Sequence, residues 1–179
     1  MLSTNVLTMI GHGERSLEDF VGLLKHHSIT TLVDIRCQDD ISKHPEFLES
    51  PLRAKLEKEH ISYHWAGRQL GKQRSFSGLE HTELPDALRG FAEYMQGTPF
   101  ARAAIQLCSL AKQGRMAIFC SQLEPENCHR RLIADYLLLQ GQQVIHIIDE
   151  KITREHILSS EARRESASLI YDHKLGKEK

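Results

Sequence analysis

The sequence has no long apolar run, no excess of charge of either sign and few cysteines. No stretch approaches the roughly 20 apolar residues that a transmembrane helix needs, and the first residues lack the basic start and apolar core of a secretory signal. The net charge is −1 at pH 7, so no bulk field draws the molecule to nucleic acid or to a membrane. These absences argue against a membrane protein, a secreted protein and a generally basic nucleic-acid-binding protein.

The four cysteines do not look like a disulfide framework. They are irregularly spaced in a chain of 179 residues, which is long enough to bury a core without cross-links. We therefore expect a reduced, cytoplasmic protein. The length fits one domain over residues 1–179, and 40% apolar with 26% charged residues is typical of a globular chain. The cysteines are Cys37, Cys108, Cys120 and Cys128.

Common phosphate and nucleotide motifs are also missing. There is no Walker A sequence, and Gly11-His-Gly-Glu14 lacks the three spaced glycines of the dinucleotide fingerprint. The arginine that cysteine phosphatases place after their nucleophile is absent as well, because position 126 is Glu126. The segment around Ile118 is therefore only superficially like a rhodanese-type loop.

Short apolar runs alternate with segments of helical periodicity. Such alternation predicts a three-layer α/β fold with a mainly parallel, Rossmann-like sheet and helices on both faces. The charged tail, residues 151–179, is expected to be helical in part. Strands are predicted at 6–10, 30–36, 61–65, 116–120 and 144–148, and helices after the cap Ser16 and at 50–59, 85–95, 99–112 and 125–139.

Polar loops follow four of the predicted strands. Gly11-His-Gly13 follows the first, Arg36 ends the second, a glycine-rich basic segment at 67–81 follows the third, and residues 120–131 follow the fourth. If the sheet is parallel, these loops gather along one carboxyl edge, where open α/β sheets bind ligands. We therefore predict a site on this edge.

Arginines in these loops suggest an anion site. Guanidinium groups match phosphate and carboxylate geometry, and a helix N-terminus near Pro125 would add N–H donors. Glycines allow close approach of the backbone to a ligand. Surface charge and ordinary turns are the alternative. The predicted ligand-binding residues are Gly11, Arg36, Arg68, Gly71, Arg74, Cys120, Arg130 and Arg131, with Lys72 beside them.

Cys128 is predicted to open the helix that follows the fourth strand. A thiol at a helix N-terminus beside cations ionises more readily and can act as a nucleophile. His129 follows it directly and cannot share its helix face, so His12 or His44 is better placed by position to act as a base. The candidate catalytic residues are therefore His12, Cys128 and His129. The alternative is that Cys128 is a small core residue.

The 11 histidines do not indicate a metal site. The spacing of Cys120, Cys128 and His129 does not match ordinary zinc ligands, so we expect neither a metal nor a cofactor. Six histidines lie among polar neighbours and are expected on the surface, namely His26, His27, His60, His81, His156 and His173.

Several motifs together resemble one known family. They are Thr8-Met-Ile-Gly-His-Gly13, Leu32-Val-Asp-Ile-Arg36, Leu70-Gly71 with Arg74, and the helix-forming stretch Glu124-Pro-Glu-Asn-Cys-His-Arg-Arg-Leu-Ile-Ala-Asp-Tyr-Leu137. Over residues 5–150 the chain resembles the family called domain of unknown function 488. The resemblance implies a bacterial or archaeal cytoplasmic α/β protein.

The chain departs from that family pattern at three positions. Gly13 stands where the family usually has serine, Gln122 where it has glutamate, and Lys72 where it has a second glycine. Gln122 can hydrogen-bond but cannot serve as a general base at neutral pH. The departures put a shared catalytic activity in doubt. This member would bind what its relatives act on, or act on something else.

Two functional hypotheses follow from the sequence. The leading one is a small protein that binds a phosphorylated or nucleotide-type ligand at the carboxyl edge, with Arg36, Arg74, Arg130 and Arg131 holding the anion. The second is a non-catalytic module that binds nucleic acid or a protein partner, and a metal-binding protein is less favoured. The first requires a closed pocket, whereas a nucleic-acid module requires an open basic stripe. The sequence indicates neither the substrate, the reaction nor the oligomeric state.

Overall fold

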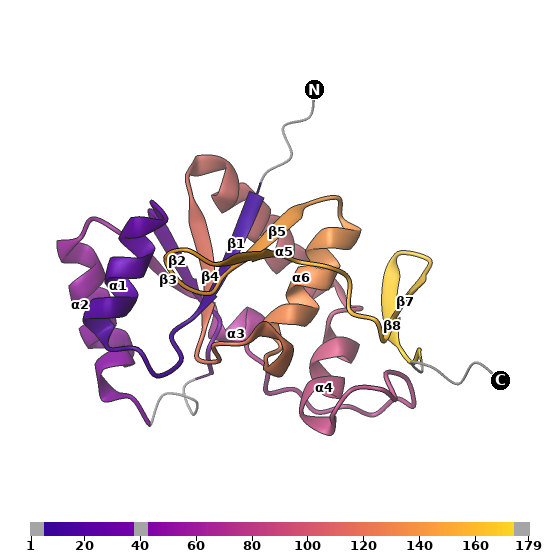
Figure 1. Cartoon of the computed structure of the whole chain (residues 1–179). Helices are drawn as coiled ribbons and strands as arrows, with labels where there is room; N and C mark the ends of the chain where they lie inside the picture. The colour runs from indigo at the N-terminus through magenta and orange to yellow at the C-terminus, as the bar shows by residue number, and fades with distance from the viewer. Residues whose placement is uncertain (1–5, 38–42, 174–179) are drawn as a thin grey trace.

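A six-stranded sheet lies at the centre of the computed structural model, which describes residues 6–37 and 43–173 (Figure 1). The strand order is β3-β2-β4-β1-β5-β6, and neighbours from β3 to β5 pair in parallel, whereas β6 is antiparallel to β5. The strands are β1 (Val6–Gly11), β2 (Thr31–Asp34), β3 (Ser62–Trp65), β4 (Met116–Cys120), β5 (Gln143–Ile147) and β6 (Thr153–Glu155).

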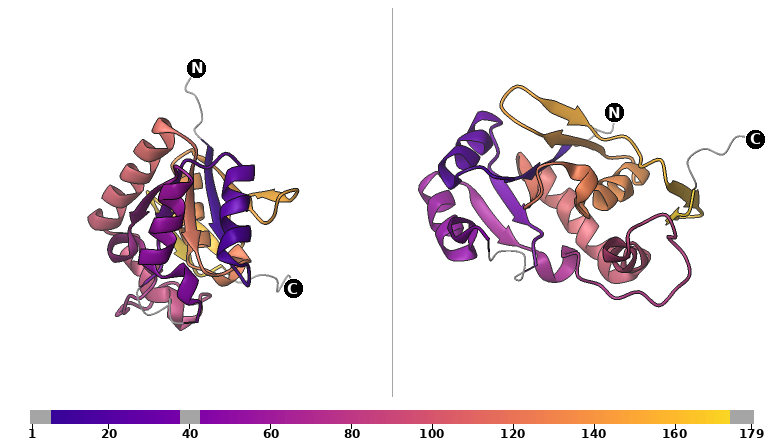
Figure 2. Two further views of the ribbon diagram at one scale, coloured as in Figure 1. Left: turned by 90° about the vertical axis from the view of Figure 1, so that its left-hand side faces the viewer. Right: turned by 60° about the horizontal axis from the view of Figure 1, so that its bottom comes forward.

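Helices cover both faces of this sheet (Figures 1 and 2). On one face, α1 (Leu17–His26) and α2 (Glu49–Lys58) pack their apolar side chains against Phe119 of β4. On the other, α5 (Thr98–Gln113) and α6 (Arg130–Leu139) pack against Ile118. The predicted three-layer fold with a mainly parallel sheet is confirmed. The remaining helices are the 3-10 turns η2 (Pro45–Phe47) and η3 (Pro125–Asn127) and the α-helices α3 (Gly67–Leu70) and α4 (Asp86–Tyr94).

Local sequence signals explain the elements that carry the site. All residues of β4 are buried, as expected of an apolar run covered on both faces. The predicted cap of α1 is confirmed, because the Ser16 hydroxyl accepts a hydrogen bond from the Asp19 N–H at 3.1 Å. Gly141 ends α6 at φ +79°, a conformation that glycine adopts without strain.

The predicted helix at 125–139 is broken into two parts. Pro125–Asn127 form η3, and α6 begins only at Arg130. Between them Cys128 is extended, with φ −132° and ψ 146°, and His129 is the N-cap of α6. The prediction that Cys128 opens a helix is therefore wrong, although its Sγ still accepts a hydrogen bond from the Arg130 N–H in the first turn of α6 at 3.5 Å.

The expectation of helix in the charged tail is also wrong. After β6, the described residues form an antiparallel hairpin of β7 (Ala162–Glu165) and β8 (Ser168–Tyr171), drawn in yellow in Figure 1. Leu169, Ile170 and Tyr171 are buried, and Arg163 bonds Asp172 across the hairpin at 3.0 Å. A short buried triplet suits a strand better than a helix, because a helix buries side chains three or four residues apart.

Part of the predicted single domain lies outside the residues that the structure describes. Residues 1–5, 38–42 and 174–179 lie beyond the described residues, so one domain over 1–179 stays a prediction. Among the helices of the described ranges, none is long and apolar enough to cross a membrane.

Candidate functional site

The carboxyl ends of the central strands lie side by side, as the predicted site requires. Gly11 at the end of β1 pairs with Cys120 at the end of β4, and Asp34 at the end of β2 pairs with Phe119. The chain leaves β1 for α1 on one face and leaves β4 for α6 on the other. Neighbouring strands that lead to opposite faces leave a crevice at their carboxyl ends, where ligands bind in such folds.

A cavity of about 220 Å³ opens at this edge. Cationic side chains reach it from three segments, namely Arg36 after β2, Lys72 after α3 and Arg131 in α6. Among the described residues, Glu126 is the carboxylate that lines it. The other lining residues are Pro85, Ala87, Leu88, Cys120, Ser121, Gln122, Cys128 and His129.

Arg36 lines this cavity as the fixed, cationic half of a buried ion pair with Asp34. Its Nε and Nη2 donate to the two oxygens of Asp34 at 2.9 and 2.8 Å, and Nη2 also donates to the Phe47 carbonyl at 2.7 Å. The Tyr63 hydroxyl donates to Asp34 Oδ2 at 2.6 Å. Burial and the Asp34 charge raise the pKa of Tyr63, so its hydroxyl stays protonated and continues to donate. The guanidinium is therefore oriented before any ligand arrives.

The two cysteines that line the cavity lie in contact. Cys120 Sγ is 2.8 Å from Cys128 Sγ, and Arg130 Nη1 donates to Cys120 Sγ at 2.8 Å. Burial opposes ionisation of Cys120, but the hydrogen bond from Cys128 and the Arg130 charge outweigh it and lower the pKa of Cys120. Burial, the Cys120 bond and the Cys120 charge raise the pKa of Cys128. The surroundings thus favour the thiolate form of Cys120 and the thiol form of Cys128.

His129 is held as a neutral ring beside this pair. Its Nε2 lies 2.8 Å from the Leu70 carbonyl, which can only accept, so Nε2 carries the proton. Nδ1 then presents a lone pair to Cys128 Sγ at 3.6 Å. Burial lowers the pKa of His129 to about 4, and the charge of Lys72 acts in the same direction.

Gly11 and Arg130 contact the loop between β4 and η3 from outside the cavity wall. Arg130 is fully buried and donates from Nη1 to the Gln122 carbonyl and from Nη2 to the Leu123 carbonyl at 2.7 Å. A Cβ on Gly11 would lie 1.7 Å from the Gln122 carbonyl oxygen, so this position has no room for a side chain. Neither residue is part of the cavity wall, and ligand binding by either stays a prediction.

The other predicted residues lie apart from the cavity wall. His12 stacks on Phe47 with ring centroids 4.1 Å apart and donates from Nδ1 to the Gly13 carbonyl at 2.7 Å. A separate, more open hollow contains Arg68, Gly71 and Arg74. Arg74 lies 3.9 Å above the Tyr94 ring and donates to the Arg68 carbonyl. The structure therefore brings Arg36, Cys120, Cys128, His129 and Arg131 together and places the remaining candidates around them.

A buried histidine network was missed by sequence reasoning. His156 Nε2 lies 2.7 Å from Asp135 Oδ1, and His156 Nδ1 lies 2.9 Å from His146 Nε2. The expectation of a surface position is wrong for His156, whose side chain is 7% exposed, and for the buried His81. These contacts join β5, α6 and the segment after β6, which are separate in the sequence. No local sequence pattern therefore predicts them. Of the other expected surface histidines, His26, His60 and His173 are exposed and His27 is half-buried.

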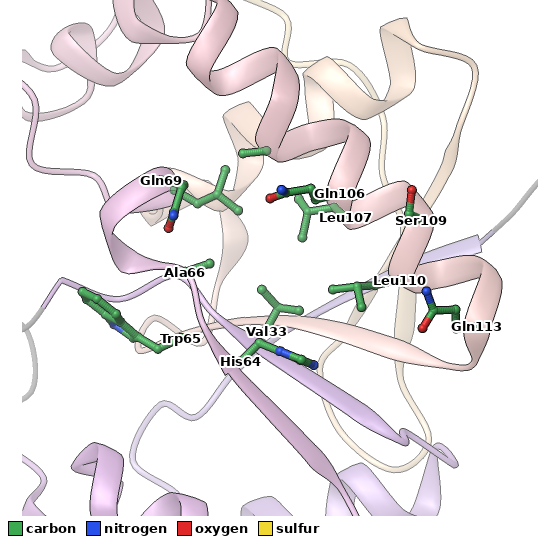
Figure 3. Close-up of a pocket in the computed structure, with 12 residues that line it drawn as sticks. Val33, His64, Trp65, Ala66, Gln69, Gln106, Leu107, Ser109, Leu110 and Gln113 are labelled. Carbon is green, nitrogen blue, oxygen red and sulfur yellow. The ribbon is translucent and has the colours of Figure 1, made fainter.

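A further hollow of about 380 Å³ lies beside the edge strand β3, on the α5 face of the sheet (Figure 3). Val33, Trp65, Leu107 and Leu110 supply apolar side chains, and His64 is its titratable group among the described residues. It lacks the convergent charges of the carboxyl-edge cavity. Within the described chain, no group of three or more His, Cys, Asp or Glu side chains is arranged to hold a metal ion.

Fold and site together define an α/β protein with a cysteine pair and fixed cations at the carboxyl edge of a parallel sheet. Residues 16–137 of the 179-residue chain match the family described as "Domain of unknown function DUF488". The chain belongs to this family, as the motifs predict. No curated protein matches the chain, and no solved structure does.

Proposed function

We propose that the chain binds a small phosphorylated or nucleotide-type ligand in the carboxyl-edge cavity. The observation that carries this proposal is the convergence of Arg36, Lys72 and Arg131 on one cavity in which Glu126 is the opposing carboxylate among the described residues. Converging cations in a partly desolvated site favour an anion. Ser121 and Gln122 add hydrogen-bonding groups to the same wall.

The volume of the cavity limits the size of the ligand that it can enclose. Drug-sized ligands occupy pockets of roughly 300–1,000 Å³, and this one has about 220 Å³. A phosphate group with a small substituent fits inside, whereas the base of a nucleotide would extend outward. In that case Arg74 and Arg68, which line the neighbouring hollow, are placed for the outer part of the ligand.

The predicted arginines take different parts in this proposal. Arg36 and Arg131 contact the anion, whereas Arg130 holds the loop and the Cys120 sulfur through its buried guanidinium. Arg131 is positioned by Ser159, whose hydroxyl accepts from Nη1 at 3.1 Å, and by Glu161 at 3.7 Å. We also propose a reduced, cytoplasmic setting, in keeping with the four free thiols.

A thermal-shift titration tests the proposal. Inorganic phosphate, sugar phosphates and nucleoside monophosphates are titrated into the wild-type chain, Arg131→Gln and Arg102→Gln. Arg102 is exposed on α5 outside the cavity and is the matched control for loss of one charge. A ligand at about 100 times its Kd adds about 2.7 kcal/mol, which raises Tm by roughly 5–10 °C.

We expect the wild type and Arg102→Gln to be stabilised equally and Arg131→Gln to lose most of the shift. Equal stabilisation of all three proteins, or of none, contradicts the proposal. A non-catalytic nucleic-acid module would instead bind single-stranded RNA with an affinity that falls steeply with salt and does not depend on Arg131.

A further inference from the structure

We propose that Cys120 and Cys128 form a peroxide-reducing dithiol, in which Cys120 attacks the peroxide and Cys128 resolves the product into a disulfide. This activity goes beyond the proposed anion binding. It uses the same cavity but does not require that an anion be bound.

The first support is the geometry of the pair. The two Sγ atoms are 2.8 Å apart, so a bond between them needs only a small displacement of side chains. The short η3 turn between them brings the second sulfur back onto the end of β4. By contrast, Cys108 lies on α5, outside the residues that line the cavity.

The second support is that the two sulfurs differ. Cys120 accepts hydrogen bonds from the Arg130 guanidinium and from the Cys128 thiol, and both favour its thiolate. Cys128 has its raised pKa and its neutral neighbour His129, and stays a thiol. Peroxides react with thiolates far faster than with thiols, so the attacking and resolving roles are assigned by the surroundings of each sulfur.

The third support is access. Cys120 and Cys128 are 2% and 5% exposed, but both line the cavity. Hydrogen peroxide or a small organic hydroperoxide enters a space of about 220 Å³, whereas a bulky oxidant or a second protein thiol does not.

The chemistry balances in two steps. The Cys120 thiolate attacks one peroxide oxygen, the O–O bond breaks, and the departing alkoxide or hydroxide takes a proton from water, which leaves a sulfenic acid. The Cys128 sulfur then attacks that sulfur, the S–O bond breaks, and the Cys128 proton leaves with the oxygen as water. His129 Nδ1, 3.6 Å from Cys128 Sγ, is placed to relay this proton. Two molecules of a cellular thiol of low molecular mass then reduce the disulfide through a mixed disulfide and leave as their own disulfide.

Mass spectrometry of the wild-type chain is the first test. The reduced full-length protein receives one equivalent of hydrogen peroxide without air and is then denatured and alkylated. Trypsin cleaves after Arg115 and Arg130, so both cysteines fall in one peptide, and cleavage after Glu126 separates them unless a disulfide joins the halves. We expect the joined peptide, with Cys37 and Cys108 still alkylated. Oxidation of Cys37 or Cys108 at an equal or faster rate overturns the proposal.

Serine variants test which cysteine attacks the peroxide and which one resolves the sulfenic acid. Peroxide consumption should fall at least roughly tenfold in Cys120→Ser, because the activated thiolate is gone. In Cys128→Ser the first step should persist, and a 1,3-dione should trap the sulfenic acid on Cys120. Cys108→Ser, a half-buried cysteine on α5, should match the wild type. Normal consumption by Cys120→Ser contradicts the assignment.

The two proposals fail separately. Absence of the phosphate-dependent thermal shift contradicts only the anion site, and absence of the Cys120–Cys128 disulfide after peroxide treatment contradicts only the dithiol. Arg102→Gln, exposed on α5 outside the cavity, should match the wild type in both assays. The peroxide reaction should also reach its plateau at a lower pH than alkylation of Cys108, because the pKa of Cys120 is lowered and burial raises that of Cys108.

Discussion

At the scale of single residues, the site depends on buried charged groups that hold main-chain atoms. Arg130 donates to two carbonyl groups of the loop after β4, and Arg36 donates to the Phe47 carbonyl while paired with Asp34. Buried guanidinium groups that lose a partner leave an uncompensated charge, which destabilises by about 3–5 kcal/mol. These arginines are therefore parts of the scaffold that positions Cys120 and the cavity wall.

A substitution of Gly11 tests this scaffold by adding a single atom, Cβ. We expect Gly11→Ala to destabilise the chain by more than about 2 kcal/mol and to slow peroxide oxidation of Cys120, because the new Cβ meets the Gln122 carbonyl at 1.7 Å. Urea unfolding measures the first effect and the alkylation assay the second. Gly22→Ala is the control, since a Cβ there meets nothing within 4 Å and α1 gains helix propensity. Equal stability of the two variants contradicts the expectation.

At the scale of elements, α6 connects the carboxyl-edge site to the C-terminal hairpin. Its first turn carries Arg130 and Arg131, and its middle carries Asp135. The Asp135 carboxylate accepts from the Tyr171 hydroxyl of β8 at 2.9 Å and from the Ser159 N–H at 2.9 Å, in addition to its contact with His156. Ser159 in turn positions Arg131. The hairpin and the cavity are thus linked through one helix.

The Tyr171 hydroxyl is expected to hold the hairpin against α6. Tyr171→Phe should destabilise the chain by about 1–2 kcal/mol and increase hydrogen exchange in β7 and β8, because Asp135 loses a buried donor. Tyr94→Phe is the control, since its hydroxyl bond to the Gln69 carbonyl is exposed. Stability and exchange in Tyr171→Phe equal to those of Tyr94→Phe would show that this hydrogen bond does not anchor the hairpin.

At the scale of the whole molecule, several buried histidines are held neutral. Burial lowers the pKa of His12 and His129 to about 4 and that of His146 to about 3. In the unfolded chain these groups return to about 6.5. Between about pH 6.5 and 4 the unfolded chain therefore binds more protons than the folded chain, and the folded state loses stability as pH falls through this window.

We expect the free energy of unfolding to fall from pH 7 to pH 5, with each such histidine contributing up to about 1.4 kcal/mol per pH unit. Urea unfolding at a series of pH values measures the slope. His146→Asn should flatten it, whereas His26→Asn, at an exposed position of α1, should leave it unchanged. The same slope in both variants contradicts the assignment to buried histidines.

The sequence by itself determined the alternation of strands and longer helices from β1 to β5 and the edge to which the polar loops lead, but not the strands β6, β7 and β8 of the tail. Alternation of apolar runs with helical periodicity is local, and parallel pairing follows from the long connections between strands. Ser16 as a cap and the family membership were equally readable. The boundaries of the elements were harder to predict from the sequence. The helix expected from Pro125 is interrupted by an extended Cys128 before α6 begins.

Only the tertiary structure decided which side chains meet. The contact of Cys120 with Cys128, the inward turn of Arg130 and the pairing of Asp135 with His156 and Tyr171 depend on packing between separate elements. Local sequence patterns record which residues are buried, but the partner of a buried polar group is set by whichever donor or acceptor the folded chain brings within about 3 Å. For this reason the tail formed strands, and Arg68 and Arg74 separated from the cavity at the carboxyl edge.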